Sequence, residues 1–292
     1  MRIGYFVLLN NPVATRSYVG AVGAAADACG FHSLWVGEHI VLFDAYDSRY
    51  PYSEDGGLAL PRSAGLLEPM TTLAFLASCT QTIRLGTGIY ILPQHNPVQA
   101  AKEISNVDWL CGGRLDLGVG IGWSEEEFTA LAAPWPRRAA RTLEYLEVME
   151  RLWRDEVASF EGDSYRLAPC RMDPKPVQRP RPPLYFGGNS EPALRRVATR
   201  GDGWLGLSLG PEEVARCVQR LEGMAGEAGR SFSELDIAVF PGLEPVGLDL
   251  VKRYRDAGAT QVLASATGDT PDAIGAEIKR LAGDLLGRAD AL

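Results

Sequence analysis

The sequence is poor in the residues that build disulfides and metal sites. Its 292 residues include five cysteines, which are scattered along the chain without a CxxC pair. Such a set indicates reduced, buried thiols and hence a cytoplasmic protein. There are only three histidines, His32, His39 and His95, and none has a partner at metal-ligand spacing such as HxxxH. We therefore expect no metal site.

Positive charge and long apolar runs are also scarce. Lys and Arg total 29 against 37 Asp and Glu, so the net charge is −8. Nucleic acids and anionic membranes select basic surfaces, so this balance argues against both as partners. No apolar run approaches the length of a membrane span. The apolar start, residues 2–9, is not followed by a cleavage signal and is expected to form the first strand.

What the chain does contain is a regular alternation of short apolar strands and helices. Strands are expected at residues 3–9, 33–36, 83–92, 114–121, 184–186, 204–207, 236–240 and 261–264. Helices are expected at residues 17–29, 68–79, 96–110, 138–154, 191–199, 211–228, 247–257 and 271–286. In a chain of this length, the alternation favours a single (β/α)8 TIM barrel with insertions, spanning residues 1–292, over an open doubly wound sheet. No shift in composition marks a domain boundary.

Two irregular stretches interrupt the alternation. Residues 43–65 are polar and aromatic and have no helical period. They are too long for an ordinary connection, so we expect a functional loop or lid that is mobile without ligand. The tyrosines in this stretch suggest an apolar or aromatic substrate. The proline-rich stretch 157–183 contains residues 160–165, which are typical of a hairpin.

The glycine run from Gly118 to Gly122 superficially matches a dinucleotide fingerprint. It reads GxGxG rather than GxGxxG, it lies on the fourth strand, and no acidic residue follows at the ribose-binding distance. The glycines could allow close strand packing, or they could form a flat strand end for a planar ring. We favour the ring because Trp123 and the acidic residues 125–127 follow where barrel active sites lie.

A second glycine turn, Gly187-Gly188-Asn189-Ser190, joins a strand to a helix that Asn189 or Ser190 would cap. Free N–H groups and the helix dipole at such a turn can hold a phosphate. An ordinary glycine turn with a serine cap has the same sequence, so both readings stay open.

Glu38 and His39 follow the second strand, at the end of the barrel that carries chemistry. Imidazole exchanges protons near neutral pH, which makes His39 a candidate for proton transfer. His95 lies in a turn after the third strand and could line the rim of the site. His32 begins a strand at the opposite end and is expected to be structural.

Taken in order, these blocks resemble the luciferase-like monooxygenase superfamily, in particular its branch that depends on coenzyme F-420, an 8-hydroxy-5-deazaflavin. The resemblance covers nearly the whole chain and is densest from Glu68 to Trp204. It implies a (β/α)8 barrel that binds a flavin or deazaflavin at the carboxyl ends of its strands, and a homodimer.

The resemblance also implies roles for individual residues. His39 would take part in proton transfer beside the redox ring, with Glu38 orienting it. Many relatives have aspartate at the position that Glu38 occupies in this chain. A non-prolyl cis peptide backing the ring would fall at Gly88–Ile89. Where a sugar-phosphate dehydrogenase of the family has a catalytic glutamate, this chain has Trp123, which argues against that substrate class. The implied cofactor-binding residues are Thr87, Gly88, Ile89, Gly120, Ile121, Gly122, Gly187, Gly188, Asn189 and Ser190.

Two enzyme functions follow from this resemblance. The first is a coenzyme F-420-dependent oxidoreductase that transfers a hydride between the deazaflavin ring and a small organic substrate. The alternative is a flavin monooxygenase that uses reduced FMN and O2. A flavin-binding protein without turnover is disfavoured because the His39 site is intact.

Overall fold

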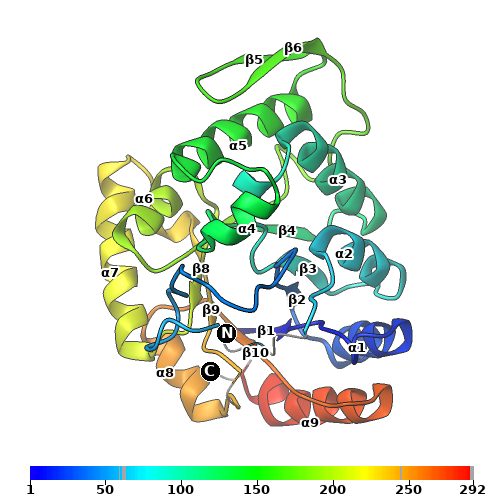
Figure 1. Cartoon of the computed structure of the whole chain (residues 1–292). Coiled ribbons are helices and arrows are strands. Elements are labelled where there is room, and N and C mark those ends of the chain that lie inside the picture. The colour runs from blue at the N-terminus through cyan, green and yellow to red at the C-terminus, as the bar shows by residue number, and fades with distance from the viewer. Residues whose placement is uncertain (59, 61–63, 244, 290–292) are drawn as a thin grey trace.

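The computed structural model describes residues 1–58, 60, 64–243 and 245–289. Eight parallel strands close into a barrel in the order β1-β10-β9-β8-β7-β4-β3-β2, and helices surround them (Figure 1). The barrel strands are β1 (Arg2–Val7), β2 (Ser33–Val36), β3 (Arg84–Thr87), β4 (Leu115–Val119), β7 (Leu184–Gly187), β8 (Gly203–Leu207), β9 (Asp236–Phe240) and β10 (Gln261–Ala264). The predicted (β/α)8 barrel is confirmed.

The helices follow the strands as the sequence predicts, with one addition. They are α1 (Arg16–Cys29), α2 (Pro69–Ser78), α3 (Pro97–Leu110), α4 (Glu125–Ala130), α5 (Arg138–Arg154), α6 (Glu191–Arg200), α7 (Pro211–Glu227), α8 (Leu248–Asp256) and α9 (Pro271–Ala289). Short 3-10 helices are η1 (Leu92–Gln94) and η2 (Phe232–Glu234). None of the helices in the described ranges combines the length and apolar character needed to cross a bilayer.

Local signals explain where the helices begin and end. The Thr15 side chain accepts the N–H of Tyr18 and caps α1, and Gly30 ends that helix in the left-handed region with φ 84°. Asn96 caps α3 in the same way, and Pro97 occupies the first helical position, where its missing N–H costs nothing.

The barrel interior is a packed core rather than a channel. Successive residues of a strand point to opposite faces, so Phe6 points inward while Tyr5 and Val7 pack against the outer helices. The inner cluster consists of Phe6, Trp35, Tyr185, Leu205, Ala238, Phe240 and Leu263. This core supports the loops at the carboxyl ends of the strands.

The structure differs from the sequence prediction around the third and fourth strands. β3 ends at Thr87, not at residue 92, and the Gly88–Ile89 peptide bond is cis, as the resemblance implied. After it, Tyr90 pairs only with Val119 in an isolated bridge. The short helix α4 was not predicted, because six residues are too few to show a helical period. The expected hairpin is confirmed as β5 (Ala158–Glu161) and β6 (Arg166–Cys170), which lie beyond α5 in Figure 1.

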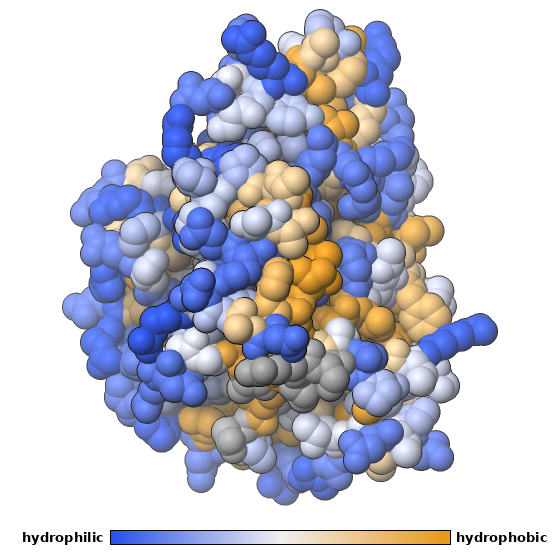
Figure 2. Space-filling view, in the orientation of Figure 1, coloured by the Kyte–Doolittle hydropathy of each residue, from blue (hydrophilic) through white to orange (hydrophobic). Residues whose placement is uncertain are grey.

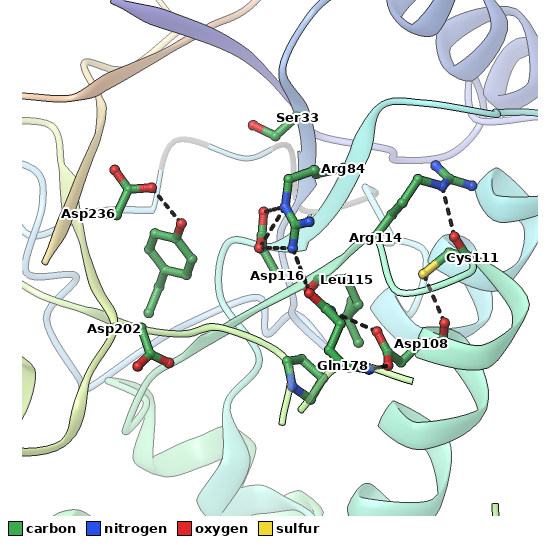
Figure 3. Close-up of polar contacts among 12 residues, drawn as sticks. Ser33, Arg84, Asp108, Cys111, Arg114, Leu115, Asp116, Gln178, Asp202 and Asp236 are labelled. Atoms are coloured by element: carbon green, nitrogen blue, oxygen red, sulfur yellow. Dashed lines mark hydrogen bonds and ion pairs between the residues drawn. The ribbon is translucent and has the colours of Figure 1, made fainter. Parts of the chain in front are cut away.

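The amino-terminal end of the barrel is closed by buried polar contacts (Figure 3). Arg84 Nη2 donates to Asp116 Oδ1 at 2.6 Å and to the carbonyl of Leu115 at 3.1 Å, while the Tyr185 hydroxyl donates to Asp236 Oδ2 at 2.6 Å. Burial disfavours the charged form of Arg84, but the hydrogen bond and charge of Asp116 outweigh it and raise the Arg84 pKa. These groups lie at strand starts, the end of a barrel that serves stability rather than chemistry.

Gly118 on β4 permits a close approach of β3 that no other residue would allow. A Cβ at this position would lie 2.0 Å from the carbonyl oxygen of Thr87. We expect Gly118→Ala to lower the free energy of unfolding by about 2–3 kcal/mol through overpacking, measured by urea denaturation. Gly223→Ala in α7 is the control, because nothing lies within 4 Å of that position, and it should be neutral or slightly stabilising. Equal midpoints for the two variants would contradict the close-packing argument.

Candidate active site

The predicted site residues lie at one end of the barrel. Glu38 and His39 follow β2, the Gly88–Ile89 bond follows β3, Gly120 to Gly122 follow β4, and the Gly187 turn ends β7. Because these strands are parallel neighbours, their carboxyl ends meet at the same mouth. Within the described part of the chain, no group of three or more His, Cys, Asp or Glu side chains is arranged to hold a metal ion.

Glu38 pairs with His95, not with His39. Glu38 Oε1 lies 2.8 Å from His95 Nε2, and its Oε2 accepts the backbone N–H of Ile91. The Tyr90 ring stacks on the His95 ring at 4.1 Å between centroids. Burial alone would lower the His95 pKa, but the hydrogen bond and charge of Glu38 raise it. The expectation that Glu38 orients His39 is therefore wrong: this carboxylate is directed into the turn that follows β3.

His39 is oriented by Glu127, a residue that the sequence did not single out. His39 Nδ1 lies 3.1 Å from Glu127 Oε2, and Glu127 Oε1 accepts the N–H of Ile40 at 2.7 Å. Burial would raise the Glu127 pKa, but the hydrogen bond and charge of His39 lower it below its ordinary value. The His39 ring also meets Trp123 edge-on at 5.7 Å. The acidic run after Trp123 was the available signal, but only the turn of α4 shows which glutamate faces the site.

The glycines at the mouth make room for neighbouring side chains. A Cβ on Gly120 would lie 1.7 Å from Ile89 Cδ1, and one on Gly187 would lie 2.8 Å from Ile89 Cγ2. A Cβ on Gly122, which has φ 75°, would lie 2.6 Å from Phe128 Cε2. At Gly120 and Gly122 these contacts support close packing, the first of the two roles considered for this glycine run. The half-buried Ile89 is the neighbour of both Gly120 and Gly187. Its contact with a cofactor ring stays a prediction.

Two further predicted binding residues are engaged in the scaffold. The Thr87 hydroxyl donates to the carbonyl of Gly118 at 2.7 Å. The Asn189 amide donates to the carbonyl of Leu207 at 2.7 Å and accepts the Leu207 N–H at 3.2 Å, which ties β7 to β8. Ser190 occupies the N-cap position of α6, yet its side chain makes no capping hydrogen bond. The expected side-chain cap is therefore made by neither Asn189 nor Ser190.

Two half-buried arginines lie near the Gly187 turn and were not predicted. Arg196, on α6, has a buried Nε that makes no hydrogen bond within the described residues. Burial lowers the Arg196 pKa, and the charge of Arg138 lowers it further although Tyr52 acts in the opposite direction. Arg138, on α5, has its guanidinium 3.5 Å from the centroid of the Trp135 ring. Two cations close enough for the charge of one to lower the pKa of the other favour an anion.

The segment between β2 and α2 crosses the mouth of the barrel, with α4 beside it (Figure 1). Glu126 Oε1 accepts the N–H groups of Asp47 at 2.6 Å and Ser48 at 2.9 Å. The Tyr50 ring packs 5.2 Å from the Trp123 ring. The predicted lid is thus attached to α4 at its start, while its residues 59 and 61–63 lie outside the described residues.

The attachment to Glu126 leads to a test of the lid. We expect amide hydrogen exchange in residues 43–58 to be faster than in the barrel strands of the ligand-free protein, and Glu126→Gln to accelerate it further at neutral pH. Burial would raise the Glu126 pKa, but the N–H of Ser48 and neighbouring groups lower it to about 2. The contact is therefore complete above the ordinary carboxyl pKa and is lost as the pH falls towards 2.

The matched control is Glu125→Gln, which removes an exposed charge from the same turn of α4. It should leave exchange in the segment unchanged. Exchange as slow in residues 43–58 as in the strands would show that the segment is a fixed loop.

Comparison with known sequences places this geometry in a family. The model of the luciferase-like monooxygenase family matches residues 1–243. An uncharacterised protein of Mycobacterium tuberculosis strain H37Rv is 30% identical over 268 residues, covering 91% of this chain and 93% of that protein. An FMNH2-dependent dimethylsulfone monooxygenase of Pseudomonas putida is 34% identical over 140 residues, covering 47% of this chain and 38% of that enzyme.

Solved structures share the fold at low sequence identity. A monooxygenase from Streptomyces bottropensis superposes with a TM-score of 0.76 at 22% identity, covering 99% of this chain and 100% of that one. The coenzyme F420-dependent tetrahydromethanopterin reductase from Methanopyrus kandleri has a TM-score of 0.76 at 18% identity, covering 98% and 99%. With its closed barrel and the family match over most of its length, the chain belongs to the luciferase-like monooxygenase family, a family of oxidoreductases.

Proposed function

We propose that this protein is a coenzyme F-420-dependent oxidoreductase that transfers a hydride between the deazaflavin ring and a small organic substrate. The observation that carries the proposal is the His39–Glu127 pair, which lies at the same mouth of the barrel as the cis Gly88–Ile89 bond. A cytoplasmic homodimer would be the working form.

The residues at the mouth fit a cofactor with a flat ring and an anionic tail. Ile89, half-buried after the cis bond, offers an apolar wall for one face of the ring. The turn at Gly188 and the start of α6 would hold a phosphate, with Arg196 and Arg138 supplying positive charge. The unpaired Nε of Arg196 supports this, because a buried donor without a partner costs free energy that an anion would recover.

His39 would move the proton that accompanies the redox step. Glu127 engages Nδ1, which leaves Nε2 to donate a proton to the substrate or to accept one from it. Glu127, whose pKa is lowered by the hydrogen bond and charge of His39, would hold the imidazole ring in place as a carboxylate. A bound deazaflavin supplies or accepts the hydride at its ring C5. The closed lid over Trp123 would exclude water from this contact.

The second candidate is a monooxygenase that uses reduced FMN and O2. The specific observation in its favour is the arginine pair, because two cations suit a terminal phosphate dianion. The similarity of 140 residues to the dimethylsulfone monooxygenase supports the same candidate.

A binding titration of the purified protein with coenzyme F-420 and with FMN, read by fluorescence quenching, tests the proposal. We expect coenzyme F-420 to bind more tightly than FMN, and Arg196→Gln to weaken it by roughly tenfold, the loss expected for one charge-assisted contact. Arg195→Gln, on the same helix but exposed and paired with Glu227, is the matched control. Tighter binding of FMN would favour the monooxygenase, and binding of neither would refute both candidates.

A further inference from the structure

A pocket of about 430 Å3 lies between the lid segment and Trp123. This volume is within the range of small-molecule sites. Its walls include the apolar and aromatic side chains of Leu42, Phe43, Tyr46, Leu58 and Trp123. Figure 2 shows apolar side chains gathered in the middle of the face that the lid segment crosses. Asp44 and Ser48 add polar groups to these walls, so the pocket is suited to an apolar body that carries a polar group.

The charge of the pocket lining disfavours anionic ligands. Among the described residues that line the pocket, none is Lys, Arg or His, and Asp44 is the one ionisable carboxylate. An anionic ligand would meet the like charge of Asp44, an exposed side chain, with no cation among the described residues of the lining. Arg196 belongs to the part of the site near Tyr52 and Gly188, and Arg138 donates to the carbonyl of Gly122. The part of the site proposed to bind an anion is thus separate from the pocket proposed to bind the substrate.

Trp123 contributes a polar group to this pocket. Its indole N–H is buried and has no hydrogen-bond partner within the described residues. The ring is packed against Tyr46 at 5.1 Å and against His39 at 5.7 Å. A buried donor without an acceptor costs about 1–3 kcal/mol. A ligand whose oxygen atom accepts this N–H, once the Tyr46 ring shifts, would recover that free energy on binding. The Trp123 ring that carries this N–H is itself packed against the His39 ring.

We propose that the pocket binds a neutral, mainly apolar substrate with one carbonyl or hydroxyl oxygen, which accepts the N–H of Trp123 beside His39. A ligand of this class would be the substrate of the oxidoreductase proposed above, so its role in catalysis rests on that proposed function. The binding itself does not require the cofactor, so it can be tested separately.

Three probes of similar size separate the contributions: acetophenone, ethylbenzene and benzoate. Their affinities for the cofactor-free protein are measured by ligand-observed NMR titration. We expect acetophenone to bind several-fold more tightly than ethylbenzene and at least about tenfold more tightly than benzoate. Trp123→Phe keeps an aromatic ring but removes the N–H, so it should reduce acetophenone affinity to that of ethylbenzene and leave ethylbenzene unchanged.

Two more variants complete the test. Asp44→Asn should improve benzoate binding, because it removes the like charge. Trp109→Phe is the control for Trp123→Phe, since Trp109 is a 54% exposed side chain on α3 outside the pocket. Benzoate affinity equal to that of acetophenone, equal losses for acetophenone and ethylbenzene in Trp123→Phe, or no binding of any probe would overturn the proposal. If the probes bind as expected but neither coenzyme F-420 nor FMN binds in the cofactor titration, only the proposed redox function is refuted.

Discussion

His39→Asn is expected to reduce the rate of hydride transfer by roughly 10²–10⁴-fold, the usual contribution of a general acid or base. Asparagine can still hydrogen-bond Glu127, but it has no proton to exchange with the substrate. Cofactor affinity should change little, because the residues proposed to hold the anionic group lie on α5, α6 and the β7 turn. The measurement is single-turnover kinetics of the cofactor-loaded enzyme, together with the cofactor dissociation constant.

Two variants serve as references for His39→Asn. His32→Asn removes a histidine from the opposite end of the barrel and should leave turnover near normal. Glu127→Gln keeps a hydrogen-bonding group beside His39 but removes the charge, so it should give a loss between wild type and His39→Asn. Near-normal single turnover in His39→Asn, with weaker binding only, would mean that His39 packs against the ring and does not transfer a proton.

Arg84→Met is expected to lower the free energy of unfolding by about 3–5 kcal/mol, because it leaves a buried carboxylate without its partner. Asp116 has a side chain only 3% exposed, and Arg84 donates to it from Nε and Nη2 (Figure 3). Urea denaturation at neutral pH measures the loss.

A double variant distinguishes an uncompensated charge from lost packing. Arg84→Met with Asp116→Leu should recover a large part of the stability, because no buried charge then remains unpaired. Arg280→Met is the surface control: Arg280 is 61% exposed and pairs with Glu277 on α9. It should change the stability by less than about 1 kcal/mol. If the single and double variants at the barrel end lose the same stability, packing is the cause rather than charge.

Much of the fold could be predicted because its signals are local. Each strand is a short apolar run, and helices α1 to α4 begin at residues whose side chains cap them, so the alternation that defines a barrel is visible without any long-range information. The Gly88–Ile89 cis bond was predicted differently, from the resemblance of the block around Thr87 to a family. Helix α4 escaped prediction because six residues leave no periodic signal.

By itself, the sequence determined the barrel, the end at which the candidate site lies, and the presence of Glu38 and His39 there. Only the tertiary structure decided which groups these residues meet: Glu38 meets His95, 57 positions away, and His39 meets Glu127, 88 positions away. The physical reason is that hydrogen-bond partners are chosen by the spatial arrangement of loops at the barrel mouth. Two adjacent side chains on one strand end point in different directions and therefore meet different loops.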